Sequence, residues 1–355
     1  MITRARIVPL LVGAALLGAA LPGASVAAPR RASVTWPQGS AAFALKGLAV
    51  QALARTGAHG LLAGTPKGMY RSTDGGKTWH RNGPAGDVTV LAADPTSQAS
   101  RKVYAGVDGA ILRTTDSGGT WTALPRAGST STPPTLVTAI AAHGSTVAIG
   151  DDQGLFVSHD AGQTWSGGPL DQFGSLVTSL FISGSTIYLS GETVGFGEIV
   201  NGRGPYYAND GLPANGFVGD QPTSWPVTSV LAGSGAHGEV TVLACGGGTS
   251  YALEPSQIGT YQWQLSGYVI PSGDKVVSCG PFNLQPIGHH EYAVANRVAV
   301  GFCTDDGSCS PLGYSHAKVA ILSVALGDPA KKGGARRLLL GTAKGLQWFT
   351  LRKGV

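Results

Sequence analysis

Charged residues are scarce in this chain. Asp, Glu, Lys and Arg make up 13% of its 355 residues, about half of the usual share. Long amphipathic helices need more Glu, Lys and Arg than this, so a largely helical fold is excluded. Glycine is abundant instead, with 54 residues, and short runs rich in Val, Leu, Ile and Thr alternate with Gly, Pro, Asp and Asn. This pattern indicates many short strands and tight turns, and we expect an all-β fold.

The chain also lacks a strong net charge and the common catalytic motifs. Its formal net charge is +5, and its basic residues are spread out, which gives no footprint for nucleic acid. The one dense basic cluster, Lys331-Lys332 with Arg336-Arg337, is typical of a solvated hairpin loop. No phosphate-binding loop, zinc-protease motif or serine nucleophile elbow occurs, and His289-His290 is expected in an exposed turn. We therefore expect no cofactor and no metal.

Long hydrophobic runs are missing after the N-terminus. Residues 1–28 are typical of an export signal, because two arginines precede the apolar run Ile7–Pro22 and small residues at Ser25–Ala28 suit a cleavage site. An uncleaved membrane anchor is the alternative, and prolines and glycines within the run argue against it. We predict an exported chain (secreted, periplasmic or at the cell surface). It would have a single domain over residues 29–355, no transmembrane segment and a monomeric state.

Only four cysteines occur, which fits two disulfides in an exported protein. Three pairings are possible. Cys303 and Cys309 flank the sequence TDDGS and could staple one hairpin, which would leave Cys245 with Cys279. A metal site is less favoured, because neither spacing is C-x-x-C and no histidine stands at a ligand offset.

One short sequence returns three times. It reads STDGGKTW at 72–79, TTDSGGTW at 114–121 and SHDAGQTW at 158–165. We call these three stretches the aspartate turns. Each is preceded by a strand, a glycine-marked tight turn and a second strand, and a further strand lies before those. Each unit is therefore four strands in about 42 residues, which predicts the blade of a β-propeller.

Weaker copies of the unit continue to the C-terminus. The fourth keeps an aspartate, Asp210, and contains a stretch longer than the repeat, Gly191–Gly211, which we expect to be a long loop. The sixth is expected to begin with KVVSCG (275–280). The seventh lacks an outer strand, and Ala32–Pro37 could supply it because its Thr-Trp pair matches the other units. We predict seven four-stranded antiparallel blades in a ring closed by this N-terminal strand, with six or eight blades as alternatives.

The aspartate turns are better explained as corners of the chain than as an active site. Ser and Asp side chains accept hydrogen bonds from nearby backbone amides, and Gly allows the chain to reverse. Three copies spread around a ring cannot meet at one reacting centre. The residues expected to build these turns are Ser72, Asp74, Gly76, Trp79, Thr114, Asp116, Gly118, Trp121, Ser158, Asp160, Gly162 and Trp165.

The pattern S/T-x-D-x-G-x-T-W resembles the Asp-box of the BNR-repeat β-propellers. That motif occurs in sialidases, xyloglucan-type glycoside hydrolases, sortilin-type receptors and photosystem II assembly-factor-like proteins. The resemblance covers essentially the whole chain after the signal. It implies that the box is a fold element on the face of the ring away from the ligand. The resemblance therefore implies a fold and does not choose a function.

We expect a non-catalytic binding or scaffold module for a protein or carbohydrate, acting through the loops opposite the aspartate turns. Two groups of residues are candidates for contacts. Turns between second and third strands and the inter-unit loops carry Lys67, Asp108, Asp151, Asp152, Arg203, Arg297 and Lys344. The long stretch adds Phe196, Tyr206 and Tyr207. Taken alone, each charge is more simply explained as solubilising the surface.

Glycoside hydrolysis is the alternative function. Sialidase-like sites combine an arginine triad with an acid and a Tyr–Glu pair, and Arg126, Arg203 and Arg297 could face a common centre. No Arg-Ile-Pro signature occurs, and the adjacent Glu291 and Tyr292 would point to opposite faces of a strand.

A glucan-active enzyme would instead need two carboxylates about 5–9.5 Å apart. Asp151-Asp152 or Glu192 with Glu198 could supply them, although loop acids of this kind are usually solvated. The sequence identifies no catalytic residue.

A narrower possibility resembles the seven-bladed photosystem II assembly-factor family, which is associated with an arginine-rich patch. Arg71, Arg81, Arg101 and Arg113 fall in the first two units. Alternate positions on strands could bring some of them onto one face.

Overall fold

The structure is a computed structural model that describes residues 44–351 with gaps. Residues 1–43, 58, 98–100, 126–135, 169–175 and 352–355 lie outside it, together with most connections after Gly191. Between 191 and 318 only strand backbone is described, apart from the buried side chain of Val300. The predicted export signal and the strand predicted at Ala32–Pro37 are thus outside the described residues. Within the described part, no helix has the length and apolarity to cross a membrane.

Most of the described strands form four-stranded antiparallel sheets of consecutive strands. The first sheet contains β1 (Ala52–Thr56), β2 (Gly60–Thr65), β3 (Gly68–Ser72) and β4 (His80–Arg81). The second contains β5 (Val88–Ala93), β6 (Val103–Val107), β7 (Ala110–Thr114) and β8 (Thr122–Ala123). The third contains β9 (Val137–His143), β10 (Thr146–Asp151), β11 (Gly154–Ser158) and β12 (Ser166–Gly168).

Three further four-stranded sheets follow along the chain. The fourth sheet contains β13 (Val177–Ser183), β14 (Thr186–Gly191), β15 (Gly195–Val200) and β16 (Arg203–Tyr207). The fifth contains β17 (Val227–Ser234), β18 (Val240–Gly246), β19 (Thr249–Pro255) and β20 (Tyr261–Ser266). The sixth contains β23 (Leu284–Gly288), β24 (Glu291–Ala295), β25 (Ala299–Thr304) and β26 (Cys309–Tyr314).

The last sheet has three described strands, β27 (Ile321–Leu326), β28 (Arg336–Thr342) and β29 (Gly345–Leu351). A separate two-stranded sheet pairs β21 (Ile270–Ser272) with β22 (Lys275–Val277). The helical structure among the described residues is one 3-10 turn, Pro95–Ser97. The predictions of an all-β fold and of four-stranded antiparallel sheets are therefore confirmed.

Two expectations about the weaker repeats were wrong. The stretch Gly191–Gly211 is not one long loop, because β15 and β16 occupy most of it as the third and fourth strands of the fourth sheet. The pair Asn201-Gly202 between these strands is a strong signal for a two-residue hairpin and was overlooked. The sequence KVVSCG also does not begin the sixth sheet: Lys275–Val277 pairs only with β21, and β23 is the inner strand.

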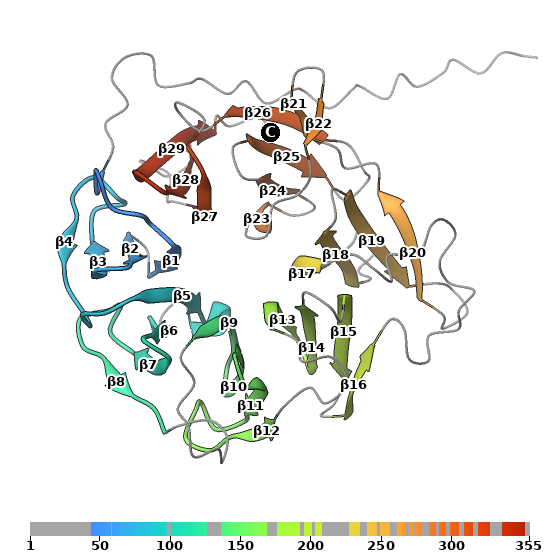
Figure 1. Ribbon diagram of the computed structural model, residues 1–355, viewed down its shortest axis with the longest axis horizontal. Helices are drawn as coiled ribbons and strands as arrows, with labels where there is room; N and C mark the ends of the chain where they lie inside the picture. Colours follow the sequence, from blue (N-terminus) through green and yellow to red (C-terminus); the bar gives the residue numbers. More distant parts are fainter. Residues whose placement is uncertain are drawn as a thin grey trace, which may run out of the picture.

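The sheets stand in a ring (Figure 1). Apart from the two-stranded sheet, which lies at the outer edge, each has its first strand toward the centre. Each inner strand contacts the inner strand of the next sheet. The contacts run from β1 to β5, β9, β13, β17, β23 and β27, and from β27 back to β1. The last and first sheets are thus neighbours, although they lie at opposite ends of the chain.

A valine at the start of an inner strand packs into a glycine notch of the preceding sheet. A β-carbon built on Gly64 would come within 2.6 Å of Val88, and one built on Gly106 would come within 2.7 Å of Val137. These distances are too short for real contacts, so only glycine leaves room for the valine. Gly150 and Val177 form a third copy. At Gly341 of the last sheet, a β-carbon would meet the Ser323 hydroxyl first and then the carbonyl oxygen and side chain of Val50, just before β1.

Hydrogen bonds from side chains follow the same route around the ring. In the second sheet the ladder shifts between Val88 and Val90, which leaves Thr89 out of register. The Thr89 hydroxyl donates to the Val137 carbonyl at 2.7 Å. Thr138 likewise donates to the Val177 carbonyl at 2.5 Å, and Ser323 of the last sheet donates to the Val50 carbonyl at 3.1 Å. At these three joints, packing and a side-chain hydrogen bond therefore tie the inner strand to the next sheet.

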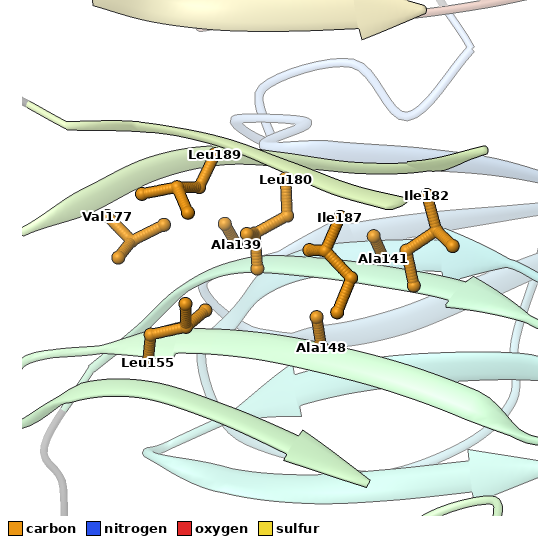
Figure 2. Packing of buried hydrophobic residues seen from close by; sticks show 9 residues of the cluster. All are labelled: Ala139, Ala141, Ala148, Leu155, Val177, Leu180, Ile182, Ile187 and Leu189. Carbon is orange, nitrogen blue, oxygen red and sulfur yellow. The ribbon is translucent and has the colours of Figure 1, made fainter. Parts of the chain in front are cut away.

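Apolar side chains fill the space between neighbouring sheets. Figure 2 shows the layer between the third and fourth sheets, where small alanines of one sheet face larger side chains of the next. Its members are Ala139, Ala141, Ala148, Leu155, Val177, Leu180, Ile182, Ile187 and Leu189. The alternating small and apolar residues of the repeat therefore serve the contact between sheets.

The described N-terminal segment lies against the last sheet. Ala44 forms a bridge with Leu346 of β29, and the Leu346 amide donates to the Ala44 carbonyl at 2.8 Å. The Gly47 amide donates to the Lys344 carbonyl at 3.0 Å, and the Val50 amide donates to the Thr342 carbonyl at 3.0 Å. Residues 44–50 therefore join the first sheet to the last.

Candidate functional site

The aspartate turns bind their own backbone. In the first, the Ser72 hydroxyl accepts the Gly76 amide at 2.8 Å and donates to Asp74 Oδ1 at 2.8 Å. Asp74 Oδ1 also accepts the amides of Lys77 and Thr78, each at 2.9 Å, and Oδ2 accepts the Thr78 hydroxyl at 2.6 Å. Both carboxylate oxygens are thereby used within the turn.

The other two turns repeat this arrangement. Asp116 accepts the Thr120 amide and hydroxyl, each at 2.8 Å, and the Thr114 hydroxyl at 2.7 Å. Asp160 accepts the Thr164 amide at 2.8 Å and hydroxyl at 2.6 Å. Each carboxylate belongs to a different sheet and is bonded within its own turn. This geometry accounts for all three acids as elements of the fold.

Hydrogen bonding makes these carboxyls unusually acidic. The hydrogen bond from the Thr120 amide has the largest effect on the pKa of Asp116, which falls to about 2 although some burial opposes the change. The Thr164 hydroxyl and amide hold the pKa of Asp160 well below its ordinary value. Burial raises the pKa of Asp74, but bonds from Thr78, Ser72 and Lys77 outweigh it and lower the value strongly. The carboxyl groups of the three turns are therefore ionised at any physiological pH.

The tryptophan of each turn packs against the preceding sheet. Trp121 lies with Met69 of the first sheet in one apolar cluster, and Trp79 lies with Leu346 of the last sheet in another. The Trp165 indole N–H donates to the Pro125 carbonyl at 3.1 Å, at the end of the second sheet. The indoles therefore serve the joints between sheets.

The aspartate turns share one face of the ring with the turns between first and second strands. The Gly75 amide donates to the His59 carbonyl at 2.9 Å, and the Ala161 amide donates to the Ser145 carbonyl at 2.8 Å. Arg113 of the second sheet also reaches this face, where its Nη1 donates to the Ala161 carbonyl at 2.9 Å. These polar groups of the face are therefore bonded within the protein.

A buried ion pair on this face was not predicted from the sequence. Asp94, 3% exposed, lies 3.0 Å from Lys102 Nζ. Its Oδ1 accepts the Thr96 hydroxyl at 2.7 Å and the Gly144 amide at 3.1 Å, and Lys102 donates to the Gly144 carbonyl at 2.8 Å. The pair clamps the β9–β10 turn of the next sheet. Although burial opposes ionisation, these hydrogen bonds lower the pKa of Asp94.

The candidate binding residues of the early and last sheets lie at the opposite ends of the strands. Lys67, Asp108, Asp152 and Lys344 are exposed in the turns between second and third strands. These turns are at equivalent places in the first, second, third and last sheets. We call this side of the ring the variable face, because its turns differ in sequence among the first three sheets, where the aspartate turns repeat.

One candidate residue on the variable face, Asp151, is buried rather than exposed as expected. Asp151 is 1% exposed, and its Oδ1 accepts the Gln153 amide at 2.7 Å. Thr65 and Thr342 play the same part, accepting the amides of Lys67 and Lys344. Asp151 is therefore a buried cap of its turn, and the expectation of a solvated loop acid was wrong for this residue. The replacement of threonine by aspartate at one position of the repeat was the available signal.

Other candidate residues have no described side chain. Phe196 lies on β15, and Arg203, Tyr206 and Tyr207 lie on β16, the outer strands of the fourth sheet. Arg126, Glu192 and Arg297 fall outside the described residues. Glu198 and Glu291 lie on β15 and β24. A shared catalytic centre involving these residues stays a prediction.

Two of the predicted disulfide cysteines are opposite each other in the backbone. Cys303 of β25 and Cys309 of β26 are register partners across the hairpin. Cys245 lies on β18, and Cys279 is outside the described residues. In the described part of the chain, no cluster of His, Cys, Asp and Glu is suited to a metal ion.

The four arginines of the first two units are divided between the faces. Arg81 Nη2 donates to the Lys67 carbonyl at 2.9 Å, on the variable face. The Arg101 carbonyl accepts the Ser117 amide at 3.1 Å, on the opposite face with Arg113. The four residues therefore do not form a single patch.

Comparisons with known proteins agree with this architecture. Residues 29–197 match the family described as photosynthesis system II assembly factor YCF48. None of the curated proteins compared with the chain matches it in sequence.

Several solved structures share the fold. The extracellular domain of a putative one-component system, BT4673 of B. thetaiotaomicron, has a TM-score of 0.61 and 14% identity, over 88% of this chain and 40% of that one. The chain thus spans about two fifths of that protein's length. YCF48 bound to D1 peptide has a TM-score of 0.57 and 16% identity, over 88% of this chain and 97% of that one. An ancestral GH74 enzyme has a TM-score of 0.56 and 14% identity, over 88% and 46%. The repeat, the sheet topology and these matches are all consistent with a propeller family, and they show that the chain is similar to BNR-repeat β-propellers.

Proposed function

We propose that this chain is an exported, non-catalytic β-propeller that binds a protein through its variable face. The observation that carries the proposal is the contrast between the two faces. In each aspartate turn, the carboxylate accepts a hydrogen bond from a backbone amide of the same turn. On the variable face, the exposed side chains of Lys67 and Lys344 have no ion pair with a described residue. Turns of one repeated geometry on one face of the ring, with turns of different sequence on the other face, are typical of a scaffold that presents binding loops.

The proposal includes seven blades and a ring closed by the N-terminal strand. Its support is the sequence of inner-strand contacts from β1 to β27 and back to β1. The contact between Gly341 and Val50 joins the ends of the chain as Gly64 and Val88 join the first two sheets. The bridge between Ala44 and Leu346 begins an outer partner for β29.

A protein partner is favoured over a glycan substrate. One solved structure of the same fold is described as bound to a peptide, and another as a GH74 enzyme, so the fold alone permits both. Asp151, one of the two adjacent acids considered for glycoside hydrolysis, is buried and caps its own turn. A catalytic acid must instead reach a substrate.

Site-specific photo-crosslinking tests the proposal. A photoreactive amino acid replaces Ala343, exposed on the variable face, or Thr73, exposed in the first aspartate turn. Illumination in the producing cells is expected to give a discrete protein adduct from position 343 and none from position 73. Equal adducts from both positions would contradict the assignment of the face. Turnover of sialosides or xyloglucan by the purified chain would overturn the non-catalytic reading.

A further inference from the structure

Basic side chains gather on the variable face where the last and first sheets meet. Lys67 and Lys344 extend from near-identical turns in these neighbouring sheets. In each turn a threonine hydroxyl donates to a glycine carbonyl at 2.7 Å and accepts the lysine amide, at 3.2 Å for Lys67 and 3.3 Å for Lys344. The two lysines are therefore held by rigid, matching backbones.

Two further cations adjoin them. Lys46 is exposed, and the next residue, Gly47, donates its amide to the Lys344 carbonyl at 3.0 Å. Arg81 is exposed, and its Nη2 lies 2.9 Å from the Lys67 carbonyl. None of these four side chains has an ion pair with a described residue. We call Lys46, Lys67, Arg81 and Lys344 the basic cluster.

A pair of carboxylates lies beside the basic cluster, at the joint of the first and second sheets. Asp108 Oδ1 accepts the Asp87 amide at 2.8 Å. Asp87 Oδ1 in turn accepts the Gln51 side-chain amide at 2.6 Å. These donors are neutral, so neither hydrogen bond is an ion pair. The connection from β4 to Asp87 is held to the first sheet by the Met69 amide, which donates to the Pro84 carbonyl at 3.2 Å.

Among the described residues, these cations and carboxylates of the face thus form no ion pairs with one another. A group of four cations with no counterion among the described residues produces a positive potential, and the two acids produce a negative one next to it. At physiological salt such fields extend about 8 Å, which is far enough to act on a docking segment but too short to reach across the ring. A partner whose charges have the matching order gains attraction from both regions, and a partner with mixed charges gains little.

We propose that the variable face binds a protein segment with an acidic block beside a basic block, the acidic block over the basic cluster and the basic block over Asp87 and Asp108. The inference rests on the proposed function, because it names the kind of partner that the same face recognises. Order of charge, rather than net charge, is the property that this surface selects.

Labelled peptides of fixed composition test the inference by fluorescence anisotropy. One peptide has a glutamate-rich half joined by glycines to a lysine-rich half, and a second has the same residues in alternation. A third keeps the glutamate half and replaces the lysines with glycine. The block peptide is expected to bind about tenfold more tightly than either of the others, with a difference that shrinks as salt rises. Equal binding of block and alternating peptides, or of block and half-charged peptides, would sink the inference.

Matched charge reversals locate the site. The double variant Lys67→Glu with Lys344→Glu is expected to lose the preference for the block peptide. Both turns are held through backbone amides, so the fold should be retained, and an unchanged melting temperature checks this. Lys77→Glu makes the same change in the first aspartate turn, at the other end of β3, and should bind as the unaltered chain does. An equal loss in Lys77→Glu would show nonspecific attraction only and refute the site.

The two proposals can fail separately. If the block peptide shows no preference while position 343 still crosslinks to a protein, the charge-order inference fails and the binding function stands. If position 343 gives no adduct and no peptide binds, both fail.

Discussion

Val177 packs directly on the α-carbon of Gly150, so that a β-carbon on this glycine would lie 2.5 Å from the β-carbon of the valine. The same fit recurs at Gly64 with Val88 and at Gly106 with Val137. In these three sheets, the absence of a side chain at one position of the second strand thus lets the inner strand of the next sheet come close.

Gly150→Ala is expected to destabilise the fold by about 1–3 kcal/mol, because the neighbouring valine is fixed by its own strand and cannot move aside freely. Thermal unfolding followed by circular dichroism measures the effect. Gly168→Ala is the matched control, since nothing lies within 4 Å of a β-carbon there. Similar melting temperatures for the two variants would mean that the joint tolerates added volume.

Asp116→Ala should lower the free energy of unfolding by about 1–3 kcal/mol, because the amide of Thr120 and two hydroxyls lose an ionised acceptor. Urea unfolding measures this loss. Thr115→Ala in the same turn changes an exposed residue and should have little effect. Binding of any partner to the variable face should be unchanged, and a large loss of affinity without destabilisation would show that the turn is itself a contact.

Stability should fall in acid as the aspartate turns become protonated. The pKa of Asp116 is lowered from 3.8 to about 2 in the folded chain. A lowered pKa adds stability above the value of the unfolded chain, and this stability is lost as the pH falls through the folded value. Unfolding free energy should therefore decrease between about pH 4 and pH 2. Asp116→Asn should show a shallower decrease, and parallel curves for the two proteins would exclude a contribution from this carboxyl.

Lys102→Met should destabilise the chain by about 3 kcal/mol, because it leaves Asp94 buried without its cation. Asp94→Asn added to Lys102→Met should recover part of this loss, since the uncompensated charge is removed. Lys77→Met, at an exposed position, is the control. A double variant that is no more stable than Lys102→Met would show that packing of the lysine, and not its charge, matters.

Deletion of residues 29–37 tests the proposed closure of the ring. If this segment completes the last sheet, the shortened chain should melt at a lower temperature, because β29 then keeps an unpaired edge. Ala44 and Leu346, which already bridge, remain in this variant. An unchanged melting temperature would place the closing strand elsewhere.

The repeat predicted the sheets most accurately where its copies are most similar in sequence. The first three units keep the aspartate turn and the glycine-marked turn, and their strands were placed from these signals alone. The fourth sheet was predicted less well, because Gly191–Gly211 keeps Asp210 but not the rest of the aspartate turn, and its length indicated a loop. Its Asn201-Gly202 pair carried the missing information.

Contacts between units could not be predicted from the repeat. The burial of Asp151 depends on a turn that closes around its carboxylate, and the pairing of Asp94 with Lys102 depends on the Gly144 turn of the next sheet. The requirement for glycine at position 64 arises only because Val88 of the next sheet packs against it. Local patterns specify strands and turns, whereas these features arise from how separate sheets meet.

The valine and its glycine notch make each of the first three units carry both halves of a joint, one for the neighbour before it and one for the neighbour after it. A duplicated unit would enter the circle with matching halves already in place. Growth by copying is therefore compatible with the fit between neighbours, while the turns at the far end of each copy are left to evolve separately.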